Sequence, residues 1–128
     1  MAKKIMVCVT PQKSCDRLIK HGHELCTEKK DALFIIHVAG YDFKFEAGTE
    51  EAAALDYLYE KAFEFGANLT VVRSSDVLET LVSLVRKNKA SHIVMGQPGD
   101  PANENNMAFN LKKKIWSEAE IVIVPALA

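Results

Sequence analysis

Ile5-Met6-Val7-Cys8-Val9, close to the start of the chain, is apolar at every position, and this run decides the fold. A strand with one face in water alternates polar and apolar residues, whereas a strand of a parallel sheet is covered on both faces and is apolar throughout. Four more short runs rich in valine and isoleucine follow, at Leu33 to Val38, Leu69 to Val72, His92 to Met95 and Ile121 to Val124. The sequence therefore predicts parallel strands at these five places.

The segments between the first three runs have the period of helices. The first places its apolar residues on one stripe between Cys15 and Cys26 and turns Asp16 away from that stripe. The second opens with Thr49, a residue type that caps helix starts, and reaches Gly66, where a left-handed C-terminal cap is expected. Strands and helices thus alternate along this half of the chain.

The same alternation continues to the C-terminus. Asp76 followed by Glu79 matches a capping box at the start of a third helix, and apolar residues at positions 107, 111 and 115 indicate a fourth. Strands that alternate with helices of this length are joined by right-handed crossovers. We expect an α/β fold, with residues 1–128 forming one domain, a three-layer α/β/α sandwich around a five-stranded parallel sheet.

Composition excludes several classes of protein. The formal net charge is −1 and the sequence pI about 6.4, so no overall positive charge favours nucleic acid or an anionic membrane. No apolar run approaches the roughly 20 residues of a membrane span, and the N-terminus lacks a signal-peptide core. Three cysteines without disulfide or zinc spacing fit a reducing compartment. We expect a cytoplasmic protein with no nucleic-acid or membrane partner.

Ligands of open parallel sheets bind outside the carboxyl ends of the strands. Four segments follow predicted strands and are therefore candidates for a site: Thr10 to Ser14, Val38 to Tyr41, Arg73 to Asp76 and Gly96 to Asn110. The last of them is the most polar, and loops in this position carry ligands in such folds.

Known chemistries do not fit these segments. A phosphatase loop that starts at Cys8 would need an arginine at the position held by Ser14. A phosphorylatable receiver domain would need acidic residues where Thr10 and Arg73 stand. Neither a GxGxxG motif nor a Walker lysine motif occurs. Nothing assembles a nucleophile, a base and an orienting group, so we expect no catalysis.

The histidines predict no metal site. His21 and His23 are two residues apart on a helix and point to different faces. His37 and His92 lie at opposite ends of their strands. We interpret all four as ordinary surface or strand-end residues.

The opening strand Lys4-Ile5-Met6-Val7-Cys8-Val9, the stretch Ser91-His92-Ile93-Val94-Met95-Gly96 with Gly99 after it, and the order of elements resemble the universal stress protein family over nearly the whole chain. Residues 8–20 and 93–98 are especially similar to the stress-protein domain inside bacterial potassium-sensor histidine kinases. The resemblance implies the strand order 3-2-1-4-5 of adenine nucleotide alpha hydrolase-like folds. It also implies, in the ATP-binding branch, an adenine nucleotide between the first and fourth strands.

That branch carries the signature G-x2-G-x9-G-[ST], whose glycines let backbone amides approach phosphates. Gly96 and Gly99 supply the first pair, but Phe109 and Asn110 replace the last glycine and the hydroxyl residue. Thr10 stands where family members often carry an aspartate. The resemblance therefore implies a degraded phosphate motif, with ATP or AMP as candidate ligands. The expected lining is Thr10, Lys13, Ser14, Val38, Ala39, Met95, Gly96, Gln97, Gly99 and Asn110.

The last apolar run would be an edge strand in the family's order, and such an edge invites pairing with another copy. Universal stress proteins commonly dimerise through this strand, which implies a homodimer built on Ile121, Val122, Ile123 and Val124. Two functions stay open at this point: a non-catalytic regulatory protein that binds a small nucleotide-like ligand, and a dimerisation or interaction module without any ligand. A nucleotide hydrolase is a more distant alternative.

Overall fold

The computed structural model describes residues 2–9, 15–41, 45–96, 107–115 and 117–125. Within these residues, strands and helices alternate from one end to the other. Their bounds are β1 (Lys4–Cys8), α1 (Cys15–Leu25), β2 (Ala32–Ala39), α2 (Glu50–Phe65), β3 (Asn68–Arg73), α3 (Val77–Asn88), β4 (His92–Gly96), α4 (Met107–Ile115) and β5 (Glu120–Val124). The predicted elements are confirmed, with strand ends that differ from the prediction by no more than one residue.

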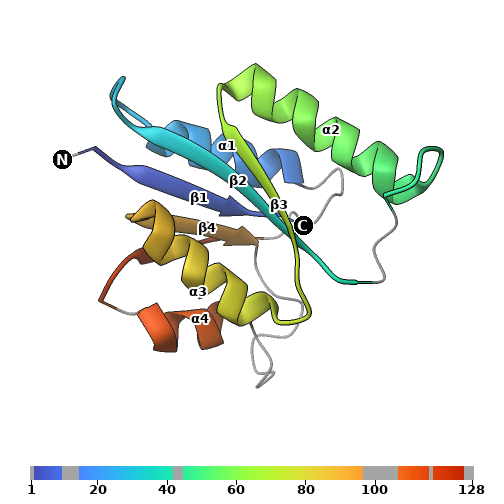
Figure 1. Ribbon diagram of the computed structural model, residues 1–128. Helices are drawn as coiled ribbons and strands as arrows, with labels where there is room; N and C mark the ends of the chain where they lie inside the picture. The colour runs from blue at the N-terminus through green and yellow to red at the C-terminus, as the bar shows by residue number, and fades with distance from the viewer. Residues whose placement is uncertain (1, 10–14, 42–44, 97–106, 116, 126–128) are drawn as a thin grey trace.

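The strands form one five-stranded sheet in the order β3-β2-β1-β4-β5, and every neighbouring pair is parallel. The expected fold class and strand order are therefore confirmed. Figure 1 shows the three layers, with α1 and α2 over one face of the sheet and α3 and α4 over the other. The sheet has two edges, formed by β3 and β5.

The core explains why the central strands are apolar at every position. Ile5 and Val7 of β1 pack into the cluster under α1 and α2, whereas Met6, between them, packs into the cluster under α3 and α4. All three side chains are fully buried. Because successive residues of a strand point to opposite faces, a strand between two helical layers needs apolar side chains on both faces.

Helix ends follow the capping residues. The Thr49 hydroxyl accepts a hydrogen bond from the Ala52 amide at 3.1 Å, and Gly66 closes α2 in the left-handed conformation with φ 65°. The Asp76 carboxylate accepts from the Glu79 amide at 3.0 Å and begins α3. These caps use backbone groups that a helix end otherwise leaves without a partner.

Two polar side chains lie deeper than their sequence pattern indicated. Asp16, expected off the apolar stripe of α1, is half-buried, and its carboxylate accepts a hydrogen bond from the Tyr57 hydroxyl of α2. His37, interpreted as a surface or strand-end residue, lies two residues before the end of β2, but only 5% of it is exposed. In both cases a polar group is tolerated inside because a partner from another element meets it.

Candidate functional site

The carboxyl ends of β1 and β4 lie side by side and define the candidate ligand-binding site. The pairing of β1 with β4 ends at Val7 and Val94, and Val9 and Gly96 each follow two residues further along their chains. β2 lies on the other side of β1 and ends with Val38 and Ala39. The structure therefore places four residues of the predicted lining, Val38, Ala39, Met95 and Gly96, at the carboxyl ends of the strands on either side of β1.

Val9 is the last described residue before the predicted loop, and β2 fixes its backbone. Its amide donates a hydrogen bond to the Ile36 carbonyl at 2.9 Å, and its carbonyl lies 3.2 Å from Nδ1 of His37. Burial lowers the pKa of His37, while the contact with the Val9 carbonyl partly opposes that shift. A neutral ring with the proton on Nδ1 can donate to this carbonyl, so His37 positions the exit of β1.

His37 is the residue of this site that the sequence interpretation missed. The available signal was its place in an otherwise apolar run, between Ile36 and Val38. A polar side chain in a strand covered on both faces needs an internal partner, and that requirement indicates a positioning role.

Gly96 ends β4 and pairs with Val124 of β5. A Cβ added to it would lie 3.7 Å from the Leu18 side chain, an ordinary contact, and its φ lies outside the left-handed region. Among the described residues, neither strain nor crowding requires a glycine here. A ligand that approaches the backbone closely would be a physical reason for a glycine at this position.

The remaining described residues of the predicted lining take different positions. Ala39 is 1% exposed and Met95 9% exposed, so a ligand would meet them through backbone atoms. Val38 is half-buried and packs toward the cluster under α3 and α4. Asn110 lies in the first half of α4. Thr10, Lys13, Ser14, Gln97 and Gly99 lie outside the described residues.

The Cys8 thiol at the end of β1 is chemically unreactive. Burial raises the pKa of Cys8 to about 12, so it remains a protonated thiol at neutral pH. A thiolate is the reactive form, and this agrees with the interpretation of Cys8 as a small hydrophobic residue.

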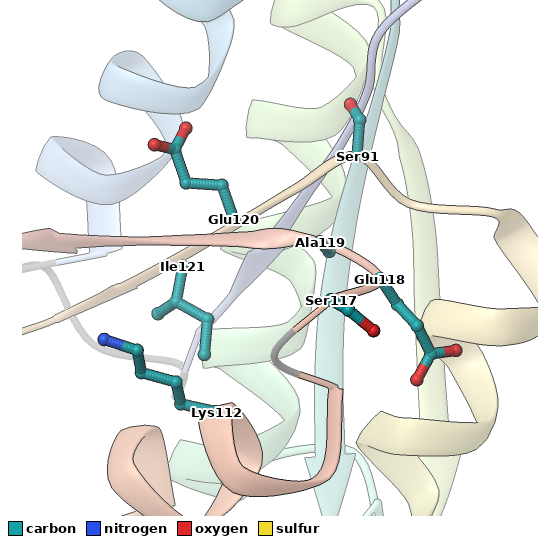
Figure 2. Close-up of a pocket in the computed structure, with 7 residues that line it drawn as sticks. All are labelled: Ser91, Lys112, Ser117, Glu118, Ala119, Glu120 and Ile121. Atoms are coloured by element: carbon teal, nitrogen blue, oxygen red, sulfur yellow. The ribbon is translucent and has the colours of Figure 1, made fainter.

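A hollow of about 610 Å³ lies at the opposite end of the sheet (Figure 2). Lys112 of α4 and two glutamates, Glu118 and Glu120, contribute to its lining. Glu118 makes a two-point ion pair with Arg86, and Glu120 lies 3.4 Å from the imidazole of His92. The hollow shares no residue with the predicted ligand site, and its carboxylates disfavour an anionic ligand.

Two further properties concern only the part of the chain that the structure describes. No cluster of three or more His, Cys, Asp or Glu side chains there could hold a metal ion. None of the helices described combines the length and the apolar character that crossing a membrane requires.

The strand order, with helices over both faces of a parallel sheet, places the chain among doubly wound α/β proteins. The family model of the universal stress proteins matches residues 1–107. The chain therefore belongs to the universal stress protein family. No curated protein matches it in sequence.

Solved structures share the fold at low sequence identity. A universal stress protein in complex with cAMP has a TM-score of 0.72 and 17% identity, with 98% of each chain covered. The universal stress protein from Archaeoglobus fulgidus in complex with dAMP has a TM-score of 0.67 and 17% identity, covering 94% of this chain and 96% of that one. UspA from Lactobacillus plantarum has a TM-score of 0.64 and 12% identity, covering 95% and 97%.

Proposed function

We propose that this chain is a non-catalytic, cytoplasmic regulatory protein that binds a small adenine nucleotide where β1 and β4 end. The observation that carries the proposal is Gly96, a glycine for which the described surroundings give no steric reason, at the end of a strand beside β1. Two structural neighbours bind adenine nucleotides, one cAMP and the other dAMP, which supports the same class of ligand.

The phosphate side of the site favours weak binding with little preference for ATP. Phe109 replaces the glycine of the ATP-binding signature, and its side chain is 53% exposed with the Lys113 ammonium 4.9 Å from the ring centre. Thr10 replaces the frequent aspartate. The base and ribose would then supply most of the affinity, and AMP should bind about as tightly as ATP.

Calorimetry with AMP, ATP, cAMP and a cyclic dinucleotide tests this proposal. We expect weak binding of AMP and ATP, and at least a tenfold loss of affinity in Gly96→Ala, because an added methyl group hinders the close approach of a ligand to this backbone. Since that Cβ has room in the fold, the variant should unfold at nearly the wild-type temperature. Ser83→Ala, an exposed position on α3, is the control and should bind like wild type.

Two results would reject the nucleotide proposal. One is the absence of heat with every nucleotide at millimolar concentration, and the other is full affinity in Gly96→Ala. Phosphate release from ATP above background would instead reject the non-catalytic part.

The second candidate function is an interaction module without a ligand. The exposed side chain of Ile123 on the edge strand β5 favours it, with 39% of the residue accessible. The resemblance to the stress-protein domain of potassium-sensor histidine kinases stays a prediction, and it also favours signalling through association. The absence of binding heat with every nucleotide, together with a dimeric mass in light scattering, would support this candidate.

A further inference from the structure

Two exposed aromatic side chains stand one turn apart on α2. Tyr59 is 67% exposed and Phe63 is 84% exposed. They border a groove of about 300 Å³ between α2 and the start of β3, whose floor includes Ala62 and Leu69. A groove of this size with aromatic walls can hold one large apolar side chain.

Carboxylates lie beside this aromatic pair. Asp56 and Glu60 are exposed on α2, with Asp56 next to Tyr59 and Glu60 next to Phe63 on the helical surface. Among the described residues, neither has a basic group within ion-pair distance, whereas Glu64 pairs with Lys61 at 3.2 Å. Tyr59, Phe63, Asp56 and Glu60 are called the α2 face below.

α4 presents the complementary arrangement. Phe109 is 53% exposed and lies between Lys112 and Lys113 on the outer surface of the helix. The Lys113 ammonium contacts the ring, and Lys114 is already engaged with Glu79 at 3.0 Å. Phe109, Lys112 and Lys113 are called the α4 face below.

The two faces cannot meet within one chain, because α2 and α4 cover opposite sides of the sheet (Figure 1). We propose that the α4 face of one copy docks onto the α2 face of a second copy. Phe109 enters the groove beside Phe63, and the two lysines approach Asp56 and Glu60. Because the α2 face is acidic and the α4 face is basic, the α2 face favours the α4 face of a second copy over a neutral or acidic partner.

The contact joins two different surfaces, so it is heterologous and arranges copies head to tail. It does not use β5, but it does use Phe109, which stands at the position of the last glycine of the nucleotide signature. Its ion pairs are exposed, so the association should be weak and should weaken further at high ionic strength.

Complementary variants test the proposal directly. In an Ile123→Lys background, which removes any pairing through β5, Phe63→Glu spoils only the α2 face and Phe109→Glu spoils only the α4 face. Phe63 is 84% exposed and Phe109 53% exposed, and neither belongs to a core cluster, so both variants should fold. Neither should self-associate in sedimentation velocity. Their mixture should form a 1:1 pair, because each variant keeps the face that the other needs.

Salt and a charge variant complete the test. Raising sodium chloride from about 20 mM to about 500 mM should weaken the mixed pair at least tenfold, since the shorter Debye length screens the exposed charges of both faces more strongly. Lys87→Glu, an exposed change on α3, should leave the pair intact. A mixture that stays monomeric, single variants that still self-associate, or a pair indifferent to salt would each overturn the proposal.

Discussion

At the scale of single residues, His37 links the folded state to pH. Its pKa is lowered from 6.5, chiefly by burial. The unfolded chain therefore takes up a proton first as the pH falls, and the folded state loses stability below the unfolded pKa. We expect the free energy of unfolding, measured in urea, to decrease between pH 7.5 and pH 5.5.

A variant isolates this contribution from the other titrating groups. His37→Gln keeps an N–H donor for the Val9 carbonyl but has no proton to gain. The difference in unfolding free energy between wild type and variant should therefore shrink as the pH falls toward 5.5. A difference independent of pH would show that His37 does not titrate in this range.

The same residue shows where the sequence stops being informative. A histidine inside an apolar strand can face solvent at the strand end or bind a partner inside, and the pattern of the strand is the same in both cases. Only the placement of Val9 beside β2 decides between them. Asp16 is a similar case, because Tyr57 is 41 residues away in the chain and no local pattern reports that contact.

At the scale of elements, Asp76 shows how a local signal gives a reliable prediction. Its carboxylate accepts from the Glu79 amide, and no other element is needed for that bond. Asp76→Ala should destabilise the protein by about 1 kcal/mol, a typical cost for a lost helix cap. Asp76→Asn should retain most of the stability, because its amide oxygen also accepts.

Urea unfolding of both variants checks this expectation, with Asp56→Ala as the control. Asp56 is an exposed carboxylate within α2 and caps nothing, so its removal should change stability by less than about 0.5 kcal/mol. Equal losses in Asp76→Ala and Asp56→Ala would contradict the capping argument.

The helices and strands, and their succession along the chain, were predictable because local sequence signals determine them. Caps such as Thr49 and Gly66 and continuous apolar runs are set by nearest neighbours and by the two covered faces of the sheet. The strand order needed the family resemblance, because the alternation of strands and helices is compatible with several orders. The site was predictable only as a set of strand ends: the sequence placed Gly96 at the end of a strand, but it could not indicate that His37 contacts the Val9 carbonyl at the end of β1.

At the scale of the whole molecule, the two edges of the sheet differ. At the end of β3, the Arg73 guanidinium lies over the Phe45 ring at 4.5 Å, so a charge and a ring stand at this edge. β5 ends the sheet on the other side, with Ile123 39% exposed. A charged edge disfavours strand pairing and an apolar edge permits it, so β5 is the edge at which we expect a homodimer to form.

Paired edge variants decide this prediction. Ile123→Lys places a charge on β5 and should convert the dimer to a monomer, whereas Val71→Lys, at a similarly exposed position on β3, should leave the dimer intact. The masses should be measured by light scattering at high salt, where the head-to-tail contact between the α2 and α4 faces is weak. A wild-type protein that is already monomeric, or a dimer that survives Ile123→Lys and dissociates in Val71→Lys, would exclude β5. In the second case the α2 side of the molecule would carry both associations, because β3 borders the groove beside Phe63.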